Sequence, residues 1–145
     1  MQTKKTLALN KLRNLSARTK IVRGGSSAGK TIAVLLILID YAIVNKGKEI
    51  SVVAESIPHL RRGALKDFLT ILKSLNRYKE RQFNRSTLKY EFTNGSYIEF
   101  FSTDQPDKLR GARRTDLFIN ECNNVSFDSF QQLSIRTSGS VWLDY

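Results

Sequence analysis

The feature that most constrains the fold is a glycine-rich stretch, GGSSAGKT, at residues 24–31. It follows KIVR, which suits a short strand, and precedes TIAVLLILIDYAIV, which is apolar nearly all round and suits a buried helix. The stretch fits the pattern G-x-x-x-x-G-K-[ST] in full, in the strand, loop and helix context that the pattern requires. We therefore expect the loop backbone to form a nest for phosphate groups at the positive end of the helix.

Every position of this stretch has an expected role in binding a nucleotide. The residues expected to line the phosphates are Gly24, Gly25, Ser26, Ser27, Ala28, Gly29, Lys30 and Thr31. Lys30 would neutralise the β- and γ-phosphates, and the Thr31 hydroxyl would be a ligand of Mg²⁺. ATP and Mg²⁺ are therefore the expected cofactors. A glycine- and serine-rich turn without a ligand is the alternative.

The remainder of the chain alternates strand and helix patterns. A buried strand is expected at 48–56, and apolar residues at helical spacing then predict one helix over 58–75, with Pro58 in its first turn. The pair Asn94 and Gly95, between two β-rich runs, predicts a hairpin.

The last third of the chain continues the alternation, with strands expected at 115–120 and 140–145 and a short helix at 126–135. Strands that alternate with helices favour a mostly parallel sheet covered on both faces. We therefore expect residues 1–145 to form one α/β domain with a P-loop NTPase fold, RecA/ASCE-like, plus the β-hairpin.

An amide and a carboxylate end the apolar strand LFINE at residues 117–121. In P-loop NTPases a strand beside the phosphate loop ends in acidic groups at the carboxyl edge of the sheet. We expect Glu121 to orient and deprotonate the attacking water, with a salt-bridged structural carboxylate as the alternative. Asn120 is, with Thr31, the other residue expected at the metal site. It stands where an aspartate usually accepts hydrogen bonds from Mg²⁺-bound water. Its amide oxygen can accept one, but the missing charge predicts weaker Mg²⁺ affinity than an aspartate would give.

The charge of the chain indicates a polyanionic partner. Lysine and arginine number 24 against 13 aspartate and glutamate residues, a formal net charge of +11. Such an excess points to nucleic acid more often than to an anionic membrane, and a solvated basic surface without a ligand is the alternative. No acidic residue precedes Asp40, whereas many basic ones do: Lys4, Lys5, Lys11, Arg13, Arg18, Lys20 and Arg23.

Several classes of protein are disfavoured. No apolar run reaches the length of about 18 residues that a membrane span needs, because Asp40 breaks the longest candidate, residues 32–44. The first residues contain no apolar block of a secretory signal, which leaves the cytoplasm as the expected location. Cys122 is the single cysteine, so an internal disulfide framework and a cysteine-based metal site on one chain are ruled out.

Three arginines lie between the hairpin and the strand at 115–120, in the segment DKLRGARRTD: Arg110, Arg113 and Arg114. Guanidinium groups suit planar, bidentate recognition of phosphate. Either these residues contact DNA or one of them reaches a γ-phosphate, and a solvated loop face is the alternative.

Together these motifs resemble the ATPase domain of the large terminase subunit of tailed double-stranded DNA bacteriophages. The matching segments cover nearly the whole chain from Lys20 onward: RGGSSAGKT, the basic helix after SVVAES, LKYEFTNGSYIEFFS, LRGARRTDLFINECNNVS and VWLDY. The resemblance implies an ATP-driven motor that moves double-stranded DNA into a procapsid as a homo-oligomeric ring on the portal. It also implies a small terminase subunit as a partner, the host cell cytoplasm as the location, and Arg110, with Arg113 as runner-up, acting in trans on a neighbour's ATP.

The chain departs from the family pattern in three ways. Ser26 stands where many members carry an arginine, and Asn120 replaces the usual aspartate. The family's coupling motif and C-terminal nuclease domain should follow residue 145, so the domain is expected to be partial. No dense acidic cluster of the kind that a two-metal nuclease needs occurs in the sequence, so DNA cutting is not assigned to this chain.

Two other functions stay open. A different P-loop motor on nucleic acid, such as a helicase or a recombinase-like protein, would share Lys30, Thr31 and Glu121 but separate strands. A nucleotide-dependent DNA-binding module without turnover is the other alternative, which the missing aspartate and the expected absence of the C-terminal part of the domain both make plausible. The main interpretation is a Mg-dependent ATPase of the terminase type. From residues 1–145 alone we expect nucleotide binding at most, because an arginine finger needs an assembled neighbour.

Overall fold

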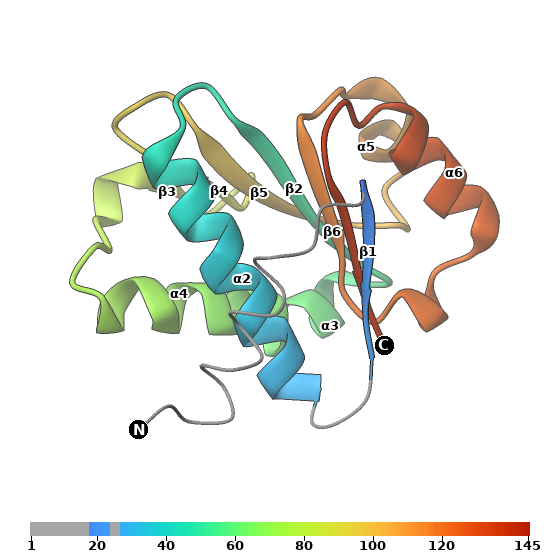
Figure 1. The fold of residues 1–145 in the computed structure, drawn as a ribbon, viewed down its shortest axis with the longest axis horizontal. Helices are drawn as coiled ribbons and strands as arrows, with labels where there is room; N and C mark the ends of the chain where they lie inside the picture. Colours follow the sequence, from blue (N-terminus) through green and yellow to red (C-terminus); the bar gives the residue numbers. More distant parts are fainter. Residues whose placement is uncertain (1–17, 24–26) are drawn as a thin grey trace.

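A computed structural model describes residues 18–23 and 27–145, and the basic residues from Lys4 to Arg13 lie outside this part of the chain. The described residues form a seven-stranded sheet in the order β1-β7-β6-β2-β5-β4-β3 (Figure 1). The strands are β1 (Thr19–Val22), β2 (Glu49–Ala54), β3 (Phe83–Asn84), β4 (Lys89–Glu91), β5 (Tyr97–Ser102), β6 (Asp116–Ile119) and β7 (Val141–Asp144). Neighbours among β1, β7, β6, β2 and β5 are parallel, and β4 and β3 are added antiparallel.

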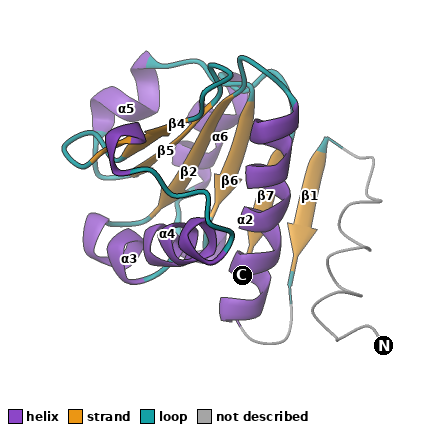
Figure 2. Ribbon diagram, turned by 90° about the vertical axis from the view of Figure 1, so that its left-hand side faces the viewer, coloured by secondary structure: helices purple, strands orange, loops and turns teal. Residues whose placement is uncertain are grey.

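Helices cover both faces of this sheet (Figure 2). The core on one face contains side chains of α2 (Ser27–Val44), α3 (Ile57–Arg62) and α4 (Ala64–Ser74). The core on the other face contains side chains of α5 (Pro106–Gly111) and α6 (Phe127–Ile135). Two 3-10 turns, Glu80–Gln82 and Cys122–Asn124, complete the described elements. The expected α/β fold, with a mostly parallel sheet between helical layers, is confirmed.

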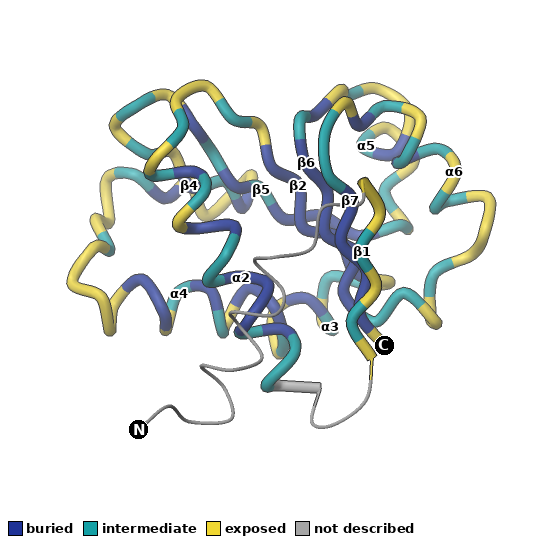
Figure 3. The backbone as a smooth tube through the Cα atoms, in the orientation of Figure 1, coloured by how far each residue is buried: buried dark blue, intermediate teal, exposed yellow. Residues whose placement is uncertain are grey.

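Alternation along the central strands separates the two cores. On β6, Phe118 packs with the α2 side, whereas Leu117 and Ile119 pack with α5 and α6. On β7, Trp142 and Leu143 divide in the same way. Successive side chains of a strand point to opposite faces, so a strand buried on both faces must be apolar throughout. Figure 3 shows the result: the central strands are dark blue, and the exposed residues lie mainly in loops and on helices.

The single helix expected over 58–75 is wrong, because the chain forms α3 and α4 with a break at Gly63. Pro58 does lie in the first turn of α3, and the Ser56 side chain accepts a hydrogen bond from the main-chain N–H of His59 as its N-cap. Gly63 takes φ −110° and ψ −104°, which is not helical. A Cβ atom there would lie 3.2 Å from the His59 main-chain oxygen and 3.6 Å from Asn120 Nδ2, so the break brings the helix junction close to the end of β6.

The hairpin expected at Asn94 and Gly95 is confirmed, since β4 and β5 pair antiparallel around a turn in which Gly95 has a φ of 88°. The Asn94 side chain also donates to the main-chain oxygens of Ala42 at 2.8 Å and Ile43 at 3.0 Å. These are carbonyls of the last turn of α2, which lack partners within the helix. The turn therefore ties the far end of α2 to the sheet. β3 was not expected, because two residues carry no periodicity.

Among the described residues, no helix combines the length and the apolar character that a membrane span requires.

Candidate active site

Three polar side chains meet where β1, β7 and β6 end. Thr31 lies in the first turns of α2, which follows β1; Asp144 is the last residue of β7; and Asn120 directly follows β6. The parallel register pairs Val22 with Asp144 and Leu143 with Ile119, so the three strands bring their carboxyl ends to one edge. This edge is the place where ligands bind in open α/β sheets.

The Thr31 hydroxyl is the centre of this group. Its Oγ1 lies 3.2 Å from Asn120 Oδ1 and 3.1 Å from Asp144 Oδ2, and it donates to one or the other. All three residues are buried, with exposed fractions of 4% for Thr31, 4% for Asn120 and 1% for Asp144. A hydroxyl, an amide oxygen and a carboxylate are oxygen ligands of the kind that Mg²⁺ takes together with water and nucleotide phosphates. The residues present therefore fit a magnesium ion.

Lys30 reaches the same edge, where its ammonium group donates a hydrogen bond to the main-chain oxygen of Tyr145. Burial raises the pKa of the Asp144 carboxyl, and the main-chain N–H of Glu121, the Thr31 hydroxyl and the Lys30 charge oppose that rise. A divalent cation would favour the ionised form further.

Glu121 adopts a backbone conformation that is unusual for a residue with a side chain. Its φ of 51° and ψ of 59° lie in the left-handed region, which costs a non-glycine residue on the order of 1 kcal/mol or more. Its main-chain N–H donates to Asp144 Oδ1, and its carboxylate lies 2.5 Å from His59 Nε2 on α3. The two side chains are 31% and 28% exposed, so the carboxylate is open to solvent at the edge of the site. Backbone strain of this kind is concentrated at functional positions.

The structure thus brings together Lys30, Thr31, Asn120 and Glu121, four residues that the sequence motifs singled out. Gly24, Gly25 and Ser26 lie outside the described residues, so their expected contacts with phosphate stay predictions. Ser27, Ala28 and Gly29 form the start of α2. No group of three or more His, Cys, Asp and Glu side chains is placed to hold a metal ion within residues 18–23 and 27–145.

Arg114 is not available for phosphate or DNA, so that interpretation of it is wrong. It is 2% exposed and its guanidinium group donates to Ser51 Oγ at 2.9 Å and to the main-chain oxygens of Leu133 at 3.0 Å and Ala112 at 3.3 Å. Burial lowers its pKa, and the negative charge of Glu99 opposes this. Arg114 is therefore a structural residue that joins β2, α6 and the segment before β6.

Arg110 and Arg113 are exposed, and the structure gives neither of them a partner among the described residues. Arg110 lies on α5, which Figures 1 and 2 both place toward the edge where β6 begins, away from the start of α2. Arg110 is consequently not part of the group around Thr31 in its own chain.

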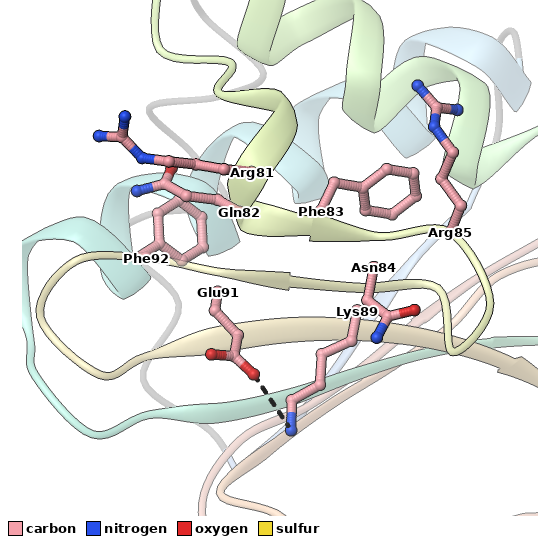
Figure 4. Close-up of a pocket in the computed structure, with 8 residues that line it drawn as sticks. All are labelled: Arg81, Gln82, Phe83, Asn84, Arg85, Lys89, Glu91 and Phe92. Atoms are coloured by element: carbon pink, nitrogen blue, oxygen red, sulfur yellow. Dashed lines mark ion pairs between the residues drawn. The ribbon is translucent and has the colours of Figure 1, made fainter.

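An open groove of about 680 Å³ lies far from this edge, on β3 and β4 (Figure 4). Its cations are largely neutralised, because Arg85 Nε lies 2.9 Å from Glu80 Oε1 and Lys89 Nζ lies 3.9 Å from Glu91 Oε1. Of the cations that line this groove, Arg81 is therefore the main one left to bind an anionic ligand.

Sequence reasoning missed two residues of the site. Asp144 ends an apolar strand, VWLD, just as Glu121 follows LFIN, and that repeated pattern was the available signal. His59, in the first turn of α3, belongs to no motif of the sequence, yet it contacts Glu121. No pattern in the sequence connects His59 with Glu121, because one lies on α3 and the other follows β6, far along the chain.

The comparisons with known proteins point to one family. The family model described as phage terminase large subunit matches residues 16–140. No curated protein matches the chain. Among solved structures, a large terminase from a thermophilic bacteriophage superposes with a TM-score of 0.79 at 22% identity, over 97% of this chain and 38% of that one.

Two further structures superpose on this chain. The same phage's large terminase in complex with ATP-gamma-S gives a TM-score of 0.73 at 21% identity, over 97% of this chain and 37% of that one. The large terminase ATPase domain of a Thermus phage gives 0.64 at 17% identity, over 94% and 62%. The chain thus spans less than two thirds of the length of these relatives. At identities this low, the superpositions establish the shared fold alone. Since the family model matches most of its length, the chain belongs to the phage terminase large subunit family.

Proposed function

We propose that this chain is the ATPase part of a viral DNA-packaging motor, which hydrolyses ATP with Mg²⁺ and moves double-stranded DNA into a procapsid. The observation that carries the proposal is the contact of the Thr31 hydroxyl with Asn120 and Asp144, beside Glu121, at the carboxyl edge of the sheet. A phosphate-loop threonine facing polar strand ends is the arrangement that an NTPase uses to hold a metal-bound triphosphate.

Each side chain at this edge has one task in the proposed reaction. Lys30 would leave the Tyr145 oxygen to neutralise phosphate oxygens, and the Thr31 hydroxyl would hold Mg²⁺. When bound, Mg²⁺ would supply positive charge that offsets the negative charge developing on the phosphate oxygens. Asn120 would accept a hydrogen bond from water on the cation. Glu121, which His59 now holds, would orient the attacking water and take its proton.

Nucleotide binding has independent support from the relatives. Two of the similar structures are complexes of a phage large terminase, one with ADP and one with ATP-gamma-S. The match to each covers 97% of this chain. We therefore propose ATP as the nucleotide and Mg²⁺ as its metal.

The partners follow from the charge and the family. A net charge of +11 favours double-stranded DNA, bound through its phosphates and without regard to sequence, as a motor that must move any sequence requires. Membership of the family supports the portal, the procapsid and a small terminase subunit as further partners, in the host cell cytoplasm. The position of exposed Arg110 away from its own Thr31 supports a ring in which Arg110 reaches a neighbour's ATP.

ATP turnover tests this proposal in the full-length protein assembled on DNA, because the expected arginine finger comes from a neighbouring subunit. Glu121→Gln keeps the shape of the side chain but removes the base, so turnover is expected to fall at least about a hundredfold while ATP-γ-S still binds. Glu91→Gln, an exposed glutamate on β4, is the matched control and should be neutral. Equal turnover in the two variants would exclude Glu121 as the base. DNA strand separation coupled to hydrolysis would favour the helicase alternative, and nucleotide binding without any turnover would favour the binding module.

A further inference from the structure

We propose that Asp144 supplies the carboxylate of the divalent-cation site, and so replaces the charge that Asn120 lacks. The inference rests on the proposed nucleotide function, and it adds to the site a residue on a different strand. It assigns the negative charge to the end of β7 instead of the end of β6.

The geometry around Thr31 is nearly symmetrical between the two strands. Asn120 Oδ1 and Asp144 Oδ2 lie at 3.2 Å and 3.1 Å from the same hydroxyl oxygen, and they come from the ends of two neighbouring strands. Neighbouring strands are about 4.8 Å apart, so a cation held by Thr31 can be reached from either strand end. Mg²⁺ commonly binds through one or two carboxylates together with phosphates and water. Of these two side chains, only Asp144 carries a charge to offer.

The contacts of Asp144 fix its carboxylate in an orientation that suits a cation beside Thr31. Its Oδ1 accepts from the main-chain N–H of Glu121, which leaves Oδ2 directed toward Thr31. A carboxylate that is 99% buried is costly unless it is paired or binds a metal ion. Among the described residues, Lys30 is the cation whose charge acts on this carboxylate, and Lys30 is also the residue expected to turn to phosphate when nucleotide binds.

A second buried aspartate gives the contrast. Asp116, at the start of β6, accepts from the main-chain N–H of Ser140, so its Oδ1 fixes the turn that precedes β7. Asp116 Oδ1 therefore contacts the turn at the opposite edge of the sheet, while its Oδ2 is buried without a hydrogen-bond partner in the described part of the chain. A purely structural role for Asp144 would be to hold the left-handed backbone of Glu121, and that role predicts no effect on cation affinity.

The test measures cation binding directly, without turnover. Mn²⁺, which is paramagnetic and substitutes for Mg²⁺, is titrated into the purified protein with saturating ATP-γ-S, and free Mn²⁺ is read by electron paramagnetic resonance. Asp144→Asn keeps the shape and removes the charge, and Asp40→Asn removes the same charge from an exposed site farther along α2. Mn²⁺ affinity is expected to fall about tenfold or more in the first variant and to stay within about twofold of wild type in the second.

Exchange of the two side chains adds a positive test. In the double variant Asn120→Asp/Asp144→Asn the charge moves to the neighbouring strand, and Mn²⁺ affinity should recover to within a few-fold of wild type. Unchanged Mn²⁺ affinity in Asp144→Asn, with ATP-γ-S still bound, would overturn this inference alone. Failure of the wild-type protein to bind ATP-γ-S would overturn the proposed function and the inference with it.

A measurement on the wild-type protein keeps the inference testable if Asp144→Asn does not fold. Mn²⁺ broadens the nuclear magnetic resonance signals of nearby backbone amides. With ATP-γ-S and Mn²⁺ bound, the signals of Thr31 and Asp144 should disappear together, before that of Asp116 at the far end of β6. Survival of the Asp144 signal after loss of the Thr31 signal would overturn the inference.

Discussion

Replacement of Asn120 by aspartate should change stability and metal binding in opposite directions. Both Asn120 Oδ1 and Asp144 Oδ2 lie within 3.2 Å of Thr31 Oγ1, so two carboxylates would be at most about 6 Å apart. At an effective dielectric constant of 20, two unit charges at that distance repel by about 3 kcal/mol. In EDTA, the free energy of unfolding of Asn120→Asp should fall by about this amount, which corresponds to a melting temperature roughly 10 °C lower.

A divalent cation reverses this effect, because it turns the repulsion into attraction from both carboxylates. The half-saturating concentration of Mg²⁺ with ATP-γ-S should therefore be lower for Asn120→Asp than for wild type, and Mg²⁺ should restore most of the lost thermal stability. Asn124→Asp, which introduces the same charge at an exposed position, is the control. Urea unfolding and thermal melting, each with EDTA and with Mg²⁺–ATP-γ-S, give both quantities. Equal stability in EDTA and an unchanged Mg²⁺ half-saturation would refute the placement of these two side chains around one cation.

Three further outcomes are expected. His59→Ala should lower ATP turnover about tenfold, because the base Glu121 loses the group that orients it, and His59→Gln should lower it less. Turnover at the wild-type level in His59→Ala would mean that His59 does not position Glu121. Arg114→Met should lower the free energy of unfolding by about 2 to 4 kcal/mol in urea, since it leaves Ser51 and two carbonyls without a donor, whereas exposed Arg113→Met should stay within about 0.5 kcal/mol. Arg110→Ala and Glu121→Ala subunits, each inactive alone, should regain partial turnover when mixed, and no recovery would count against a finger in trans.

Much of the fold could be predicted because it depends on local patterns. The alternation of apolar segments and the strand before GGSSAGKT were enough to predict a mostly parallel sheet with helices on both faces, and Asn94 with Gly95 were enough to predict the hairpin. The break at Gly63 was not predicted, because apolar residues keep their helical spacing across it, and the side chain of Asn120, which lies close to Gly63, comes from a distant part of the chain. A contact between distant segments leaves no periodic signal in either one.

The site shows the same division between local and long-range information. Lys30, Thr31, Asn120 and Glu121 could be proposed from two short motifs, since each motif lies at a strand end. Asp144 and Arg114 could not be assigned, because their roles depend on which strands are neighbours and on what covers the sheet. Arg114 looked like a phosphate-binding arginine in sequence, and only its burial against Ser51 and α6 identifies it as structural.

The most direct test of the central claim is a crystal structure of the protein with ATP-γ-S and Mn²⁺, with the cation located by its anomalous scattering. The anomalous peak is expected beside the Thr31 hydroxyl and within one water of Asp144, with the phosphates against Lys30. A nucleotide bound at another edge of the sheet, or a cation peak remote from both Thr31 and Asp144, would contradict it.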